Sequence, residues 1–327
     1  MSDPGFLLYG LALGLVWFLG INAAATLLVL AVARRLARQD RIRNPRFWLM
    51  LRLLPAAASI GLVAAVFLPG YWVYEPRAYA EEFNLTLGAA AAVALGIVVA
   101  AIARGAAAWI RAARRARAWG QKAQPLTLPE GAIPAFEIDE AAPIVALVGL
   151  LRPRLFVARS VVGALTSEEL AAGLGHELGH WRALDNLTRL AMRAAPDLLA
   201  TTAVARDLER RWASAAEHRA DRHASEMDHV DDRARARCAL ASAIVKVARM
   251  APPMTTRAEP ISSLVDDGDI ALRVRTLLDD AAPAATAARS CPPSIAMALA
   301  VAALAAVYVP LLRVVYALTE IVVQTLP

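Results

Sequence analysis

Long uncharged stretches alternate with arginine-rich segments along the 327-residue chain. Four of these stretches contain at least 21 residues each, and about 20 residues of apolar helix are enough to cross a bilayer. The pattern predicts four transmembrane helices, at about 6–32, 48–69, 83–103 and 294–317. Near the start of the second span, we expect Arg52 to extend its side chain to the membrane interface and Pro55 to kink the helix.

The region between the third and fourth spans has the pattern of a mostly helical domain with short strands. Thr166 and Glu169 have the spacing of a capping box and predict the start of one helix. The other elements predicted there are strands at 136–139 and 155–158 and helices at 104–121, 206–247 and 270–280.

These patterns together predict a mainly α membrane protein. We expect an N-terminal membrane region at 1–103, a cytoplasmic domain at 104–293, and a last span with a short tail at 294–327. A hydrophobic content of 58% excludes an ordinary soluble domain.

Loop charges predict how the chain lies in the membrane. Arginines crowd the loop at 34–46 and the segment at 104–122, whereas three of the four charges in the loop at 75–82 are acidic. Because positively charged loops stay in the cytoplasm, we expect a multi-pass protein of the bacterial inner membrane with both termini outside. The same arginines, facing anionic lipid, account for much of the net charge of +6 and argue against a nucleic-acid partner.

One short motif in the predicted cytoplasmic domain points to a specific chemistry. His176, Glu177 and His180 form an H-E-x-x-H sequence within AAGLGHELGHWRALDNL, residues 171–187. On a helix, histidines four residues apart project from the same face and can both bind one Zn²⁺ ion. Glu177 is then placed to take a proton from a water molecule at the metal. The motif therefore predicts zinc-dependent hydrolysis with Glu177 as the general base.

A catalytic zinc site needs a third protein ligand. The candidates after the motif are Asp185, Glu217, His218, Asp221, His223 and His229. Glu217 and Asp221 lie four residues apart on one predicted helix face, so we assign Glu217 as the ligand and Asp221 as a carboxylate that orients a ligating histidine. His218, His223 and His229 are expected at the surface, the alternative being that one of them donates a hydrogen bond to the tetrahedral intermediate.

Two residues close to the motif have two interpretations each. Asp185 either orients a motif histidine or ends the helix. Gly179 either lets another backbone come close to the metal face or serves tight packing between helices.

The chain also resembles the membrane metallopeptidases of BlaR/MecR type, the antirepressors of β-lactam signalling. The resemblance is carried by residues 149–187, by the E-x-x-x-D of Glu217 and Asp221, and by the LRVRTLL stretch at Arg273. Within 149–187 the matching features are Gly149, Pro153, the strand at 155–158, Glu168–Leu170, the H-E-x-x-H motif, and Arg182 with Asp185. The resemblance implies a gluzincin-like zinc metallopeptidase domain inserted between spans three and four.

The HtpX and CAAX prenyl proteases are similar at HELGHW and at the E-x-x-A-D-R that begins with Glu217. HtpX-like proteins place a hydrophobic hairpin between the motif and the third ligand, whereas only 36 residues separate His180 from Glu217 here and none forms a clean span. We therefore favour the BlaR/MecR-like interpretation. The antirepressors carry an extracellular penicillin-binding sensor after the last span, and because this sequence ends at Pro327 we expect no sensor and no antibiotic sensing.

The sequence thus predicts a zinc metalloendopeptidase at the cytoplasmic membrane face, with His176, His180 and Glu217 as zinc ligands. We expect regulatory or signalling proteolysis of a cytoplasmic regulator such as a repressor, of a membrane protein, or of the chain itself. Two alternatives stay open: HtpX-like quality control of membrane proteins, and a non-catalytic membrane receptor or scaffold. The intact Glu177 argues against the scaffold, because structure alone needs no base there.

Overall fold

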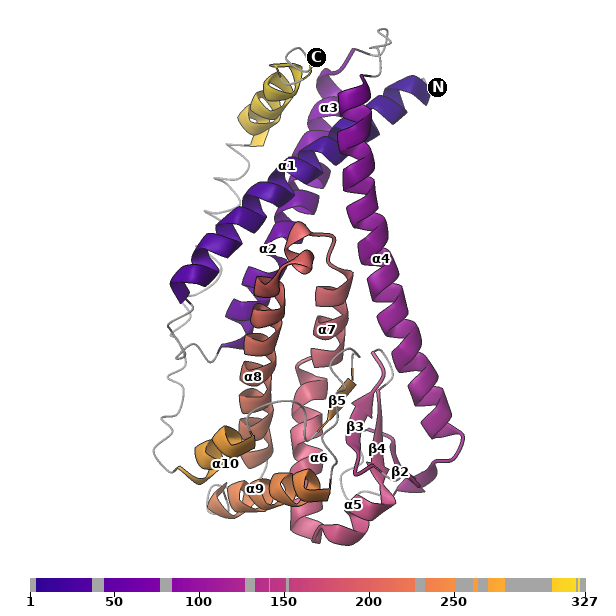
Figure 1. Cartoon of the computed structure of the whole chain (residues 1–327), viewed down its shortest axis with the longest axis vertical. Coiled ribbons are helices and arrows are strands. Elements are labelled where there is room, and N and C mark those ends of the chain that lie inside the picture. The colour runs from indigo at the N-terminus through magenta and orange to yellow at the C-terminus, as the bar shows by residue number, and fades with distance from the viewer. Residues whose placement is uncertain are drawn as a thin grey trace.

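The computed structural model describes residues 4–36, 44–76, 84–126, 133–140, 142–150, 153–226, 233–250, 261–263, 270–279, 308–321 and 323. Most of these residues are helical. Long apolar helices form one part of the molecule, and shorter helices around a five-stranded sheet form the other (Figure 1).

Three helices among the described residues are long and apolar enough to cross a membrane. They are α1 (Pro4–Leu36), the run formed by α2 (Pro45–Leu62), the π-helical turn η1 (Val63–Phe67) and α3 (Leu68–Tyr74), and α4 (Leu85–Gly120). Their positions agree with the first three predicted spans. Helix α4 continues past residue 103 as expected, and it reaches the sheet at its C-terminal end (Figure 1).

The fourth predicted span lies partly outside the described residues, which resume at residue 308. Residues 308–321 are helical and lie beside α1 and α3. Trp17 donates a hydrogen bond to the Thr319 hydroxyl at 2.9 Å, and the rings of Tyr74 and Tyr316 are 5.7 Å apart. This last helix therefore packs in the same bundle as the first three.

The sheet has the strand order β1-β2-β4-β3-β5. Its strands are β1 (Gln124–Leu126), β2 (Ala135–Ile138), β3 (Val145–Val148), β4 (Arg154–Ala158) and β5 (Ile261–Ser263). Only β2 and β4 run parallel, and the other neighbours are antiparallel. The two predicted strands are confirmed as β2 and β4. β5 was not predicted, because the prolines around it indicate a loop.

Further helices pack on the sheet and on one another, and α6 among them carries the motif. They are α5 (Arg159–Ala164), α6 (Ser167–Arg182), α7 (Asp185–Ala194), the 3-10 helix η2 (Leu198–Thr201), α8 (Ala203–Glu226), α9 (Arg233–Met250) and α10 (Ile270–Leu278). The predicted single helix at 206–247 is wrong, because α8 and α9 are separate helices that cross (Figure 1). Both pack against α6, and one straight helix cannot cover two sides of it. The helix predicted at 270–280 is confirmed as α10.

Helices α7 and α8 form a hairpin that meets the membrane helices. We call residues 195–202, which include η2, the α7–α8 turn. Leu208 and Trp212 of α8 are buried in one cluster with Trp48 and Leu51 of α2. The expectation that Arg52 extends to the interface is wrong: its side chain is 1% exposed, because carboxylates of this hairpin pair with it inside the bundle.

Candidate metal centre

Helix α6 begins with the predicted capping box. The Thr166 hydroxyl accepts a hydrogen bond from the Glu169 amide at 3.2 Å, and the Glu169 carboxylate accepts one from the Thr166 amide at 2.8 Å. Ser242 and Lys246 of α9 donate to the same carboxylate at 2.6 and 2.7 Å. Burial raises the pKa of Glu169, but these donors outweigh burial and lower the pKa to about 2. The first turn of the motif helix is thus tied to α9.

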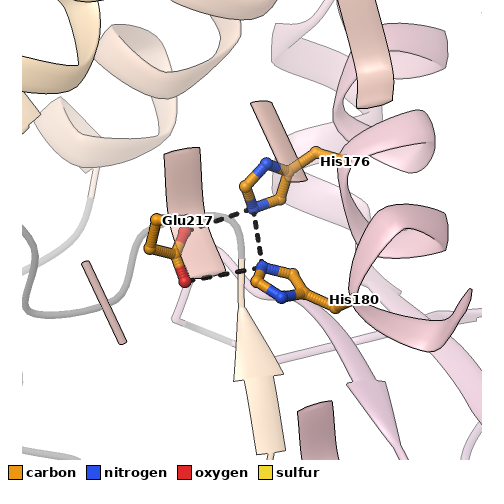
Figure 2. A group of neighbouring side chains, drawn as sticks. All are labelled: His176, His180 and Glu217. Carbon is orange, nitrogen blue, oxygen red and sulfur yellow. Dashed lines mark hydrogen bonds and ion pairs between the residues drawn. The ribbon is translucent and has the colours of Figure 1, made fainter. Parts of the chain in front are cut away.

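His176 and His180 lie one turn apart on α6 and face Glu217 of α8 (Figure 2). The two Nε2 atoms are 3.1 Å apart. Oε2 of Glu217 lies 3.3 Å from Nε2 of His176, and Oε1 lies 3.4 Å from Nε2 of His180. One ligand atom from each residue lies within 4.8 Å of the others, so these buried side chains could hold a metal ion. The structure brings together the three residues assigned from the sequence.

Gly179 explains how closely α6 and α8 approach each other. A Cβ atom at this position would lie 3.1 Å from the Cα atom of Ala220 and 3.2 Å from Cβ of His223. Ala220 is one turn beyond Glu217 on α8. The two interpretations of Gly179 therefore describe one contact, because the helix that packs against it is the helix that carries Glu217.

Each histidine contacts a second carboxylate through its other ring nitrogen. Nδ1 of His180 lies 2.6 Å from Oδ2 of Asp185, and Nδ1 of His176 lies 2.9 Å from Oδ1 of Asp221. Asp185 is the first residue of α7 and does not end α6. A carboxylate at Nδ1 favours the tautomer that carries its hydrogen there, which leaves the Nε2 lone pair directed at Glu217.

Two arginines that were not predicted as site residues hold these carboxylates. Arg273 of α10 donates to Asp221 at 2.6 and 3.0 Å, and its Nη1 lies 3.2 Å from Glu217. Arg219 donates to both oxygens of Asp185, at 2.5 and 2.7 Å. Arg219 lies two residues after Glu217 in the sequence, and Arg273 lies in the LRVRTLL stretch. Each position could have drawn attention, but the sequence does not indicate which carboxylate either arginine binds.

The buried carboxylates make this cluster favourable for a cation. Burial lowers the pKa of His180, but Glu217 and Asp185 outweigh burial and raise it to about 10. Burial alone would raise the pKa of Glu217, yet His180 and Arg273 hold that pKa well below its ordinary value, so the carboxylate is ionised. A field that attracts a proton so strongly attracts a metal cation for the same reason.

The donor set fits zinc. Both oxygens of Glu217 are buried, and among the described residues neither accepts a hydrogen bond of good geometry. With a carboxylate at Nδ1 of each histidine, the two Nε2 lone pairs and the Glu217 oxygens converge, and a proton or a metal cation between them relieves their mutual repulsion. Two imidazole nitrogens and one carboxylate oxygen are ligands that zinc takes, with a fourth position left for water or substrate.

Glu177 and the remaining candidate histidines take different positions. Glu177 is buried on α6, directly after His176. His223 lies apart from the cluster, with Nε2 3.2 Å from Nη1 of Arg182, and burial together with that guanidinium lowers its pKa. His218 is partly buried on α8. His229 lies outside the described residues.

Comparison with known proteins finds one family model that matches the region around this centre. Residues 111–255 match the model of peptidase family M48, whose members are metal-dependent peptidases. The matched region contains every residue of the cluster and its carboxylate partners, but not Arg273. No curated protein matches the chain. The match is consistent with a resemblance to BlaR- and HtpX-type peptidases and does not distinguish between them, and with the apolar helices it indicates a membrane metallopeptidase.

Proposed function

We propose that this chain is an integral-membrane zinc metalloendopeptidase that hydrolyses peptide bonds at the cytoplasmic face of the membrane. The observation that carries the proposal is the buried cluster of His176, His180 and Glu217 inside a region that matches a metallopeptidase family. Zinc is the proposed metal because magnesium and calcium prefer oxygen ligands, and two of the three ligand atoms here are imidazole nitrogens. The arginines at 34–46 and 104–122 support the cytoplasmic placement.

The chemistry divides between the metal and the protein. When bound, zinc supplies Lewis acidity, which makes a water molecule acidic near neutral pH and polarises a carbonyl group. Glu177 acts as the general base that accepts the proton of the attacking water and passes it to the departing amine. Asp185 and Asp221 keep Nε2 of His180 and of His176 directed at the metal.

We propose that the physiological role is regulatory proteolysis at the membrane. Helix α8, which carries Glu217, packs along α2 over its first half, so the centre is held next to the predicted spans. A site in this position favours substrates that come to the membrane, such as a membrane-associated regulator, a membrane protein or the chain itself.

Quality control of membrane proteins is the second candidate, and one observation favours it. The segment between His180 and Glu217 forms the α7–α8 hairpin, whose turn contacts α1 and α2. HtpX-like proteins place a hairpin at the same point of the sequence. Neither helix of this hairpin is among the described helices that are long and apolar enough to span a membrane, but the turn of the hairpin meets those helices.

The test compares new protein N-termini in cells that carry the wild-type chain or Glu177→Gln. A few N-termini that occur only with the wild type would support regulatory proteolysis and would identify the substrate. Many scattered N-termini would support quality control instead. Identical N-termini in both strains, with an inducing condition included for each, would contradict a peptidase that depends on Glu177.

A further inference from the structure

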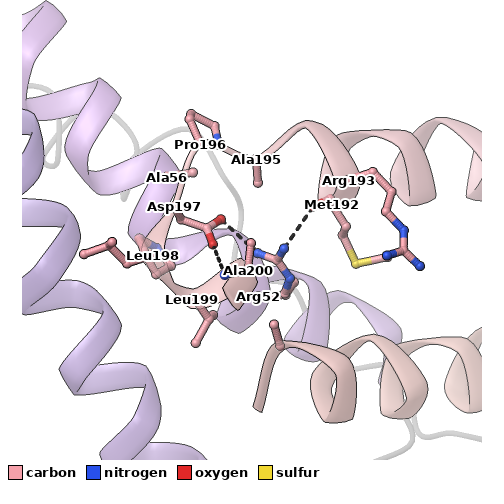
Figure 3. A network of polar contacts seen from close by, with 12 residues as sticks. Arg52, Ala56, Met192, Arg193, Ala195, Pro196, Asp197, Leu198, Leu199 and Ala200 are labelled. Atoms are coloured by element: carbon pink, nitrogen blue, oxygen red, sulfur yellow. Dashed lines mark hydrogen bonds and ion pairs between the residues drawn. The ribbon is translucent and has the colours of Figure 1, made fainter. Parts of the chain in front are cut away.

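Arg52 is a buried charge within the apolar part of α2. Its side chain is 1% exposed, and its guanidinium has three partners on the α7–α8 hairpin. Figure 3 shows two of them, Asp197 and Met192. Nη1 donates to Asp197 at 2.9 Å, Nε to Glu209 at 3.0 Å, and Nη2 to the Met192 carbonyl at 2.9 Å. Met192 lies in the last turn of α7, and Asp197 lies in the α7–α8 turn. The guanidinium thus binds the C-terminal end of α7 to α2.

The other two membrane helices hold the same end of α7. Arg104 of α4 donates to the carbonyls of Arg193 and Ala195, at 3.4 and 3.1 Å. Asn22 of α1 donates to the Pro196 carbonyl at 3.0 Å and accepts from the Leu198 amide at 3.0 Å. We call Asn22, Arg52 and Arg104 the membrane clamp. Its two guanidiniums lie where the helix dipole of α7 favours positive charge.

Close packing reinforces the clamp. A Cβ atom at Gly105 of α4 would lie 2.7 Å from Cβ of Ala194, the last residue of α7. No larger side chain fits at Gly105 without a shift of one helix. The end of α7 is therefore packed directly against the backbone of α4.

The opposite end of α7 belongs to the metal centre. Its first residue, Asp185, contacts Nδ1 of His180 at 2.6 Å. The helix has ten residues, which corresponds to a length of about 15 Å. Leu184, just before it, has a left-handed backbone with φ of 56°, so α7 leaves α6 in a fixed sharp turn. Because a short helix moves as a rigid body, a displacement at the clamp shifts Asp185 and the ring that it orients.

We propose that Arg52 is a positioning residue for the metal centre, which acts through α7 on Asp185 and His180. The membrane helices thereby influence the centre through the clamp, because a change in how α1, α2 and α4 hold the end of α7 alters the affinity of the centre for zinc and its turnover. This inference rests on the proposed function as a zinc peptidase. It assigns to the predicted spans a role beyond anchoring the domain in the bilayer.

The test uses the full-length chain in lipid nanodiscs with Arg52→Met. The matched control is Tyr71→Phe, which removes a buried 2.8 Å hydrogen bond to the Phe6 carbonyl and thus a contact between α3 and α1 away from α7. Zinc affinity is measured by competition with a chelator, and kcat and KM are measured on a peptide. We expect Arg52→Met to weaken zinc binding about tenfold, as loss of support around a metal ligand does, and to lower kcat more than KM. Tyr71→Phe should change neither.

Amide hydrogen exchange of the metal-free protein gives an independent readout. In Arg52→Met, exchange should become faster throughout α7, including the Thr188 amide, which bonds to the Leu184 carbonyl at the first turn. Faster exchange confined to the α7–α8 turn, with zinc affinity equal to that of Tyr71→Phe, would overturn the proposal and leave Arg52 a merely structural residue.

Two further results separate the possible failures. If Arg52→Met does not fold, Arg104→Gln replaces it in the test, since that substitution removes two hydrogen bonds from a partly exposed residue. Arg104→Gln must then show the same losses of zinc affinity and kcat, or the proposal is wrong. If the wild-type chain binds no zinc, the proposed function fails, and the exchange of α7 in the metal-free protein still decides whether the clamp controls Asp185.

Discussion

Arg273 donates two hydrogen bonds to the carboxylate of Asp221, from Nε at 3.0 Å and from Nη2 at 2.6 Å. Asp221 in turn lies 2.9 Å from Nδ1 of His176. The arginine comes from α10, outside the residues that match the peptidase family. Helix α10 therefore completes the surroundings of a centre whose other members come from α6, α7 and α8.

Replacing Arg273 with glutamine should destabilise the protein strongly. Its side chain is 3% exposed, and its loss removes the guanidinium that pairs with two buried carboxylates, Glu217 and Asp221. Breaking a buried ion pair from one side costs about 3–5 kcal/mol. Thermal unfolding of the metal-free protein measures the loss.

Arg235→Gln is the matched control for that substitution. Arg235 pairs with Glu168, but the side chains are 67% and 54% exposed. An exposed pair contributes at most about 1 kcal/mol. Equal destabilisation by the two substitutions would contradict the role assigned to the buried pair.

Glu217→Ala should weaken zinc binding strongly, because the substitution removes a metal ligand. Loss of a residue that only hydrogen-bonds to a ligand lowers metal affinity roughly 10- to 100-fold, and we expect a larger decrease here. Glu226→Ala is the control, since Glu226 is an exposed residue of the same helix. Isothermal titration with zinc measures both. Wild-type affinity in Glu217→Ala would exclude this residue from the metal site.

Gly179→Ala should force α6 and α8 apart, because its Cβ would meet the backbone of Ala220 at 3.1 Å. Such overpacking costs about 1–3 kcal/mol, and the shift of α8 should also weaken zinc binding. Gly163→Ala, in α5, has no atom within 4 Å of the new Cβ and should be neutral or stabilising. Unchanged stability and zinc affinity in Gly179→Ala would show that the helices are not held at this distance.

Glu169 should make the stability of the protein depend on pH in the acid range. Its pKa is lowered from 4.5 to about 2 in the folded state. Its stabilising contribution is therefore complete above about pH 4.5 and is lost as the pH falls toward 2. Unfolding with a chelator present, from pH 5 to 2, should show a smaller decrease in stability for Glu169→Gln than for the wild type. Glu168→Gln, at an exposed position, should follow the wild type, and a Glu169→Gln profile equal to that of the wild type would refute the assignment.

The residues of the metal centre that share a helix could be predicted from the sequence. A separation of four residues places His176 with His180 on one face and Glu217 with Asp221 on another. The start of α6 could also be predicted, because the capping box depends only on Thr166 and Glu169, three residues apart. Short strands at 136–139 and 155–158 were recognisable from apolar runs between turn residues.

Residues that depend on distant partners could not be predicted in this way. Arg52 has the local pattern of an interfacial arginine. Its burial becomes favourable only through two carboxylates of the hairpin, Asp197 and Glu209, which lie 145 and 157 residues away in the sequence. Arg273 likewise gains its role from a carboxylate 52 residues earlier. Both α8 and α9 have buried apolar residues at helical spacing, and nothing local indicates that the two helices cover different sides of α6.

The most direct test of the central claim uses the purified full-length chain loaded with zinc. Hydrolysis of an unfolded protein substrate is compared between the wild type and Glu177→Gln, and the zinc content of each is determined by mass spectrometry. We predict about one zinc ion per chain in both proteins and hydrolysis only by the wild type, since Glu177 supplies the base and not a ligand. Equal hydrolysis by both proteins, or a wild-type chain that retains no zinc, would contradict the account.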